Sequence, residues 1–301
     1  MFGSTSPLRR NVRPNETPVE RSLIRPVLPP MTQTEVILKG KKQDRITADL
    51  GFRRGDRGTH SSRTMMFSEL ATLLDALDTT ASTEDFRRAV VDENLLGKKT
   101  NATRRLAFQR LSELYAFDKQ TPIFRIFWQF WDYGPQGRNL LAILCAAARD
   151  PLLRSTADAV LGTPVGEVVT KPTIIAALRE ATGERFNDAS LDKIARNAAS
   201  SWTQSGHLSG RNIKIRQNPD VSVANTAYAF FLGYLEGVRG PSLHETVWIR
   251  ILSASEGTVS QLAMDACRRR WMTYRRVGRV IEVSFPGLLT VKERELIREQ
   301  G

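Results

Sequence analysis

The chain has 301 residues, a length that suggests two domains or one large one. Hydrophobic residues make up 41% and charged residues 25%, which is ordinary globular usage and excludes a fully disordered or a fibrous chain. There are 44 Lys and Arg against 32 Asp and Glu. The net charge of +12 favours a polyanionic partner, either nucleic acid or an anionic membrane surface.

Charge and composition together divide the chain into three parts. Residues 1–63 carry 13 basic and 6 acidic side chains, residues 64–165 carry 12 of each, and residues 166–301 carry 19 and 14. The first part mixes prolines with arginines and has no repeating apolar face, so we expect residues 1–63 to form a disordered basic arm. We expect residues 64–165 to form an all-α domain and residues 166–301 a winged-helix-like region.

Helical periodicity runs through residues 64–165. Apolar residues repeat at helical spacing from Phe67 to Leu77. Ser82 and Asp85 have the spacing of a capping box, and Thr100 can cap the helix that follows. Further helices are predicted to carry the aromatic residues of 124–131, the apolar run 140–148, and the segment 150–162. Six helices with short links predict an all-α bundle, with the aromatic residues of 124–131 in its core.

Beyond residue 163 the pattern changes to helices separated by short strands. The expected order is helices over 172–178 and 191–205, a two-faced strand within 208–217, a buried helix over 224–236, helices over 242–252 and 258–270, and a hairpin over 271–285. Helix, helix and hairpin is the order of a winged helix-turn-helix, and it occurs weakly over 170–217 and more clearly over 242–286. The prediction is a mainly α fold with a short β-hairpin wing.

Residues suited to catalysis or metal binding do not gather in the sequence. His60, His207 and His244 are isolated, with no His or Cys one helical turn away. Residues 97–100 lack the spacing of a phosphate-binding loop, and residues 206–210 lack the central Ser of a nucleophile elbow. We therefore expect no metal, no cofactor and no enzymatic activity, although scattered carboxylates leave a nuclease site open.

Cysteine usage and hydropathy bear on location. Cys145 and Cys267 are far apart and cannot form a disulfide framework, which favours a reducing compartment. The longest apolar runs are half the length that a bilayer requires, and the N-terminus has no apolar segment typical of a secretory signal. These features predict a cytoplasmic protein without a membrane span.

Three stretches collect basic residues and nearly exclude acids, whereas an ordinary charged surface mixes both signs. The first stretch, 94–112, contains Lys98, Lys99, Arg104 and Arg105. The second, 193–216, contains Lys193, Arg196, Arg211, Lys214 and Arg216. The third, 265–281, contains Arg268, Arg269, Arg270, Arg275, Arg276 and Arg279. We predict that these side chains contact DNA phosphates, most strongly in the third stretch, where three guanidiniums surround the predicted hairpin tip.

A resemblance to a known family agrees with this prediction. The segment from Ala89 to Leu106, followed by Arg110, Leu111 and Leu114, resembles the BrxA-like proteins of BREX bacterial phage-defence systems. The stretch 191–208, with Trp202, Gly206, His207 and Leu208, is similar to a later helix and turn of that family. The resemblance covers roughly residues 65–210 and leaves the third basic stretch outside it.

The resemblance implies a non-catalytic DNA-binding protein with a NusB-like helical half and a winged-helix half. It also implies partners from the defence locus, namely a methyltransferase, a PglZ-type phosphatase-like protein and ATPases. The leading hypothesis is thus a sequence-tolerant double-stranded DNA-binding component of an antiphage system. The alternatives are a scaffold or adaptor whose basic faces bind acidic partner proteins, and an RNA-binding protein.

Overall fold

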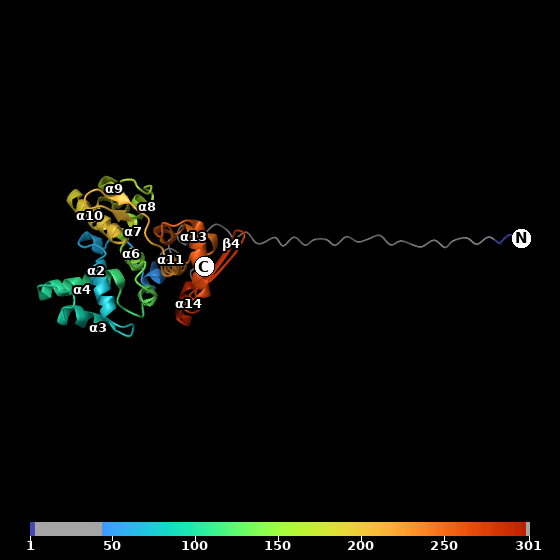
Figure 1. Cartoon of the computed structure of the whole chain (residues 1–301), viewed down its shortest axis with the longest axis horizontal. Helices are drawn as coiled ribbons and strands as arrows, with labels where there is room; N and C mark the ends of the chain where they lie inside the picture. The colour runs from blue at the N-terminus through green and yellow to red at the C-terminus, as the bar shows by residue number, and fades with distance from the viewer. Residues whose placement is uncertain (4–43, 299–301) are drawn as a thin grey trace.

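The computed structural model describes residues 1–3 and 44–298 of the chain, and the other residues are drawn as a grey trace in Figure 1. The described part is mainly helical and contains two antiparallel sheets of two strands each. The predicted mainly α fold is confirmed at this level.

The first half holds the expected series of helices. Its elements are η1 (Thr59–Ser61), α2 (Phe67–Ala76), α3 (Thr83–Arg87), the π-helical turn η2 (Arg88–Asp92), α4 (Asn101–Tyr115), α5 (Pro122–Trp131), α6 (Arg138–Arg149), α7 (Pro151–Ser155) and α8 (Ala157–Leu161). Ser82 and Asp85 form the predicted capping box of α3. Thr100 caps α4 as predicted, in a second capping box with Thr103. These side chains accept from backbone N–H groups that have no partner within their own helix.

One predicted helix is divided in two. The segment 150–162 was expected as a single helix, but it breaks at Thr156 between α7 and α8. The Thr156 hydroxyl donates to the Leu153 carbonyl at 2.7 Å and accepts from Trp202 Nε1 at 2.8 Å. A threonine hydroxyl that bonds to a nearby carbonyl competes with the helical hydrogen bonds, which accounts for the break.

The second half alternates helices with the two hairpins. Its elements are α9 (Lys171–Thr182), η3 (Gly183–Arg185), α10 (Asp188–Gln204), β1 (Leu208–Ser209), β2 (Ile215–Arg216), α11 (Val223–Leu235), η4 (Gly240–Glu245), α12 (Val247–Ile251), α13 (Glu256–Arg268), β3 (Thr273–Val277), β4 (Val280–Ser284) and α14 (Val291–Arg298). Strand β1 pairs with β2, and β3 pairs with β4. The predicted hairpin over 271–285 is thereby confirmed.

Helices α5, α6 and α11 form the centre of the molecule. All side chains of α6 from Leu140 to Ala148 are buried, as expected of a helix that is apolar all round. Helix α11 contacts α5 and α6 from the first half and α12 and α13 from the second. The aromatic residues of α5 are buried as predicted. One continuous hydrophobic core therefore crosses the expected boundary between residues 165 and 166.

Residues 44–63 belong to the folded body, which corrects the prediction that all of 1–63 is a disordered arm. A helical segment over 44–49 and the turn after it bury Ile46 and Leu50, and the ring of Phe52 lies 5.8 Å from that of Trp248. These apolar residues are few and follow no helical or strand period, so the sequence pattern did not indicate them. The remainder of the predicted arm, residues 4–43, lies outside the described residues.

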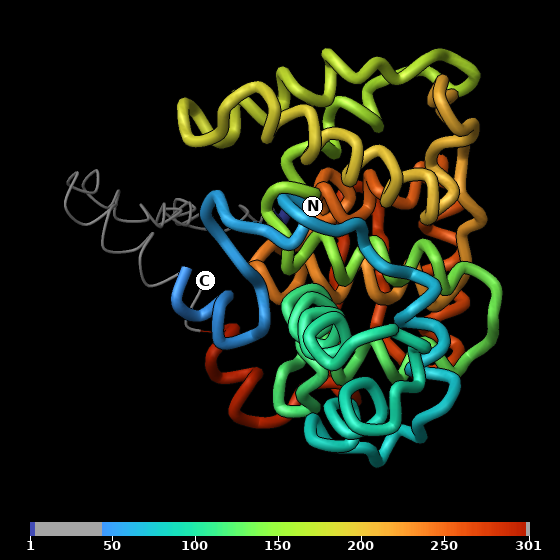
Figure 2. Tube along the Cα trace, turned by 90° about the vertical axis from the view of Figure 1, so that its left-hand side faces the viewer, coloured from blue at the N-terminus to red at the C-terminus, as the bar shows by residue number. Residues whose placement is uncertain are grey.

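His60 joins this segment to two distant helices. Its Nδ1 lies 2.8 Å from Asp150 Oδ2, and its Nε2 lies 2.8 Å from Ser201 Oγ on α10. Its backbone N–H also donates to Asp150 at 2.9 Å, and all three side chains are buried. Figure 2 shows the blue segment that contains His60 crossing the face of the molecule between the α9–α10 pair and the α3–α4 region. The structure therefore gives His60 two side-chain partners, Asp150 and Ser201, that its neighbours in the sequence did not indicate.

The Asp150 carboxylate stays charged despite its burial. Removal from water favours the neutral carboxyl group, but the charge and hydrogen bonds of His60 outweigh that effect and lower the pKa of Asp150. Its second oxygen caps α7 by accepting from the backbone N–H groups of Leu152 and Leu153, at 3.0 and 3.2 Å. Asp150, His60 and Ser201 thus form one buried polar network between three segments, which we call the His60 network.

We predict that His60→Ala destabilises the fold by about 3–5 kcal/mol, because it leaves the buried Asp150 carboxylate without the partner on which it depends. His244→Ala is the matched control, since His244 is only half-buried and forms no ion pair with any residue of 44–298. We expect the control to cost about 1 kcal/mol. Urea unfolding of both variants measures the difference, and equal losses would show that the His60 network contributes nothing special.

Candidate nucleic-acid interface

Helices α9 and α10 and the β1–β2 hairpin form a continuous unit over residues 171–216. The hairpin pairs Leu208 with Arg216 and Ser209 with Ile215, and Val168 adds an isolated bridge to Ile215. Gly210 turns the chain with φ +91°, and a Cβ there would lie 2.1 Å from the Ile213 carbonyl oxygen. The tight turn therefore requires glycine, and it presents residues 211–214 beside α10.

Helix α10 has one buried and one exposed face. Leu191, Ile194, Ala198 and Trp202 are buried at helical spacing, which fixes the side of the helix that meets the core. Two basic residues of the second stretch, Lys193 and Arg196, lie on the exposed face. The two cations occupy positions between the buried apolar ones, so the helical period that buries one face exposes them.

A groove separates α10 from the β1–β2 hairpin. It has a volume of about 670 Å³, and Lys171, Arg196, Arg211 and Lys214 are among the residues that line it. Ser200, Thr203 and Asn212 add uncharged polar groups to the same wall. Four cations therefore line one concave surface, which we call the α10 groove. Lys171 was not among the predicted DNA contacts, because it lies outside the second basic stretch.

Part of this positive charge is already neutralised. Asp192 Oδ1 lies 2.5 Å from Lys171 Nζ, and Asp192 Oδ2 lies 3.0 Å from Arg196 Nε. The hydrogen bond from Lys171 is the main cause of a lowered pKa for Asp192, so this carboxylate is ionised at neutral pH. Within residues 44–298, neither the Lys193 nor the Arg211 side chain has a hydrogen-bond or ion-pair partner. These two exposed cations are the ones most open to an external anion.

Arg216 does not belong to this surface, which corrects its predicted role as a DNA contact. It is 3% exposed, and its Nη2 donates to Ser253 Oγ at 2.6 Å while Nη1 donates to the carbonyls of His207 and Gln217. These bonds join the β1–β2 hairpin to the turn after α12. Alternation along β2 placed Arg216 on the inner face, and its long side chain reaches the backbone there.

The third basic stretch divides over several environments. Arg275 and Arg276 point to opposite faces of β3: Arg275 faces Glu282 at 4.0 Å, whereas Arg276 lies 2.8 Å from Glu256 of α13. Arg268 pairs with Asp265, and Arg269 lies over the Trp271 ring at 5.3 Å. Only Arg270 and Arg279 are exposed without such a partner among the described residues of this stretch. Arg275, Arg276 and Arg279 therefore lie on one hairpin but in different surroundings, and their predicted contact with DNA stays a prediction.

Two of the four cations named in the first basic stretch are also engaged within the fold. Lys98 Nζ lies 3.0 Å from Glu69, and Arg104 donates to the carbonyls of Val91 and Lys98 at 3.4 Å. Lys99 and Arg105 are exposed. Figure 1 places α4, which carries Arg105, and the β3–β4 hairpin at opposite sides of the folded body, with α10 near its top. The first and third basic stretches therefore lie on different sides of the folded body.

The His60 network has the hydrogen-bond order of a Ser–His–Asp triad, but its serine is closed off. Ser201 is fully buried, and its hydroxyl accepts from the Met65 N–H at 2.8 Å and donates to the Asn197 carbonyl at 3.1 Å. A nucleophilic serine needs space for a substrate carbonyl and nearby oxyanion donors. We infer a structural role for this serine, which holds α10 against the segment 58–66.

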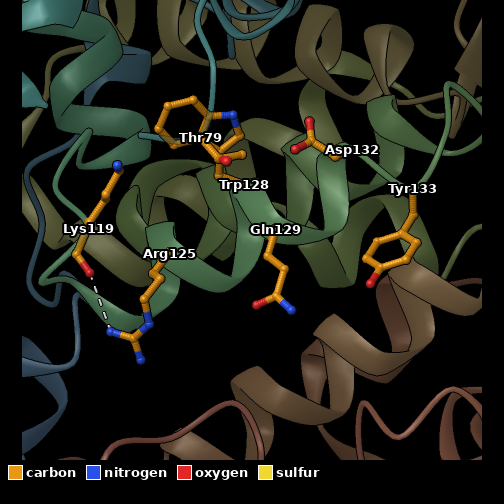
Figure 3. A pocket seen from close by; sticks show the side chains of 7 residues that line it. All are labelled: Thr79, Lys119, Arg125, Trp128, Gln129, Asp132 and Tyr133. Atoms are coloured by element: carbon orange, nitrogen blue, oxygen red, sulfur yellow. Dashed lines mark hydrogen bonds between the residues drawn. The ribbon is translucent and has the colours of Figure 1, made fainter. Parts of the chain in front are cut away.

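A separate pocket of about 380 Å³ lies beside α5 (Figure 3). Lys119 lies 5.7 Å from the centre of the Trp128 ring, and Asp132 lines the same wall with the opposite charge. Arg125 forms a bidentate ion pair with Glu293 at 2.8 and 2.9 Å, which ties α14 to α5. The pocket thus carries mixed charge and is not a basic surface.

No group of three or more potential metal-binding side chains occurs in the described part of the chain. Within the same residues, no helix combines the length and apolar character needed to cross a bilayer. No protein-family profile matches the chain, and the search of curated proteins gives no significant match. Function is therefore inferred from the residues, their geometry and their charge.

His207, which directly precedes β1, makes the stability of the fold depend on pH. It is fully buried, with Nε2 2.6 Å from the Ile251 carbonyl and Nδ1 2.8 Å from Ser205 Oγ. Burial, assisted by the charge of Arg216, lowers the pKa of His207 from 6.5 to about 3, although the bond to Ile251 opposes the shift. The folded protein therefore holds a neutral imidazole at pH values where the unfolded chain is protonated.

We predict that stability falls as pH decreases from about 6.5, because the unfolded state binds a proton that the folded state does not. The slope from this group approaches about 1.4 kcal/mol per pH unit. His207→Gln keeps a donor for the Ile251 carbonyl and does not titrate, so its stability should change less between pH 6.5 and 4.5. Urea unfolding at a series of pH values tests this, and parallel curves for both proteins would contradict it.

Proposed function

We propose that this chain binds double-stranded DNA through the phosphate backbone, with little sequence selectivity, and has no catalytic activity of its own. The observation that carries the proposal is the α10 groove. There the α10 helix and the β1–β2 hairpin bring Arg196, Arg211 and Lys214 of the second basic stretch into one groove, and Lys193 is exposed on the same helix. A concave basic surface of this kind suits a polyanion.

The order of elements supports a winged-helix mode of binding. Helix α10 follows α9 after a short turn and precedes a two-stranded hairpin, so α10 takes the position of a recognition helix and β1–β2 that of a wing. In this arrangement Lys193 and Arg196 approach the duplex from the helix, while Arg211 approaches from the wing. Ile213 at the hairpin turn is 64% exposed and adds an apolar contact beside these cations.

The biological setting is proposed from the sequence resemblance. The stretches at 89–114 and 191–208 resemble BrxA-like proteins, and the first half would correspond to their NusB-like domain. We therefore propose a role in a bacterial antiphage locus of the BREX type, together with a methyltransferase, a PglZ-type protein and ATPases. Binding of acidic partner proteins or of RNA by the same cations is the alternative that the experiment below separates.

We predict that Arg196→Ala/Arg211→Ala weakens duplex binding and flattens the log–log salt dependence by about 2, since each phosphate contact contributes about 0.9 to the slope. Lys99→Ala/Arg105→Ala is the matched control, because it removes two exposed cations from the opposite half. Filter binding or a mobility-shift assay between 50 and 200 mM salt, with unrelated duplex DNA sequences and duplex RNA, provides the measurement.

Wild-type protein should bind unrelated DNA duplexes with similar affinity and prefer them to duplex RNA. The control variant should keep the wild-type slope. If the control variant instead lost affinity and salt slope while Arg196→Ala/Arg211→Ala kept both, the interface would lie on the first basic stretch. A complex with duplex DNA that is insensitive to salt, or no complex at all, would contradict the proposed function.

A further inference from the structure

The tip of the β3–β4 hairpin exposes two valines side by side. Val277 and Val280 are paired across the hairpin and are 79% and 70% exposed, the two highest values for large hydrophobic residues between positions 44 and 298. The turn between them consists of Gly278, with φ +58°, and Arg279. Exposed apolar surface on a narrow ribbon is unfavourable in water, so a tip of this kind suits a partner that covers it.

Positive charge lies next to these valines. Arg279 occupies the turn itself, and Arg275 lies two residues before Val277 on the same strand, with only a 4.0 Å contact to Glu282. Glu282 is the only acid within 273–284. The tip therefore combines an apolar end with arginines beside it, a chemistry that matches an apolar surface bordered by negative charge.

The root of the hairpin is held firmly. Tyr274 packs against Phe230 at 5.7 Å between ring centres, and Phe285 packs against Phe231 at 5.3 Å. Arg276 forms its ion pair with Glu256 of α13. These contacts join both strands to α11 and α13, so the hairpin is held rigidly against the folded body.

We propose that this tip is an apolar wedge that enters the minor groove of duplex DNA and kinks it. Paired strands lie about 4.8 Å apart between their axes, so the ribbon is wider than a minor groove of about 6 Å and its tip enters where the duplex is kinked open. Val277 and Val280 press on a base step, where β-branched side chains lose little freedom on insertion, and Arg275 and Arg279 reach the flanking phosphates. The inference rests on the proposed duplex binding and adds deformation of the DNA to it.

The test is duplex bending measured by energy transfer between dyes at the two ends of a 30-base-pair duplex of about one hundred ångströms. Wild-type protein, Val277→Ser/Val280→Ser, and the control Val291→Ser are compared, with binding followed in parallel by mobility shift. Val291 is 64% exposed at the start of α14, away from the tip in sequence. Wild type and the control should raise transfer to a level that corresponds to a bend of about 20–90°.

The double variant should bind with the wild-type salt slope and leave transfer at the value of the free duplex. Bound duplex that remains straight with wild-type protein would overturn the wedge and leave the proposed function intact, as would equal bending by wild type and the double variant. Absence of any duplex binding would overturn both. Binding to phosphatidylserine vesicles is measured for the same three proteins. If the double variant loses vesicle binding but bends DNA as wild type does, the tip would be assigned to a membrane surface instead.

Discussion

The buried contact between His60, Asp150 and Ser201 sets the position of the helix on which the proposed function depends. Ser201 lies on the inner face of α10, and Asp150 begins α7 directly after the central helix α6. Because His60 reaches both, the orientation of α10 about its own axis is fixed relative to the core. Trp202, which donates to Thr156 of the α7–α8 junction, strengthens the same constraint. The opposite face of α10 is then the one that carries Lys193 and Arg196.

The same network illustrates why geometry alone does not define an active site. Its distances of 2.8 Å on both sides of the imidazole are those of a catalytic triad. Its burial, and the prior engagement of the Ser201 hydroxyl with Met65 and Asn197, describe instead a satisfied polar cluster in a low-dielectric interior. Such clusters hold their members in one arrangement, since any single loss leaves a buried group unpaired.

Local features of the sequence predicted the local structure well. The capping positions Ser82 and Thr100, the apolar run of α6 and the hairpin around Gly278 depend on neighbours within a few residues. Several of the misses involve partners that are far apart in the chain. Arg216 bonds to Ser253, and Arg276 pairs with Glu256 across the hairpin and helix. Helical and strand periods relate only residues a few positions apart, so they do not indicate these pairs.

The candidate site was likewise predicted only where it depends on local sequence. The run of basic residues singled out Lys193 and Arg196, and the structure exposes both on α10. The meeting of that face with Arg211 and Lys214 across a groove depends on the turn at Gly210 and on the buried anchors of the hairpin, His207 and Arg216. Segment 44–63 was missed for a related reason. Its few buried side chains follow no period, and their burial depends on contacts with core residues that are distant in the sequence.

Hydrogen exchange with and without duplex DNA tests the central claim most directly, since it locates the covered backbone without altering any residue. The account predicts slower exchange of backbone amides over residues 193–214, from α10 into the β1–β2 hairpin, with no change over 94–112. Protection confined to 94–112, or a saturated complex with unchanged exchange over 193–214, would show that the α10 groove is not where DNA binds.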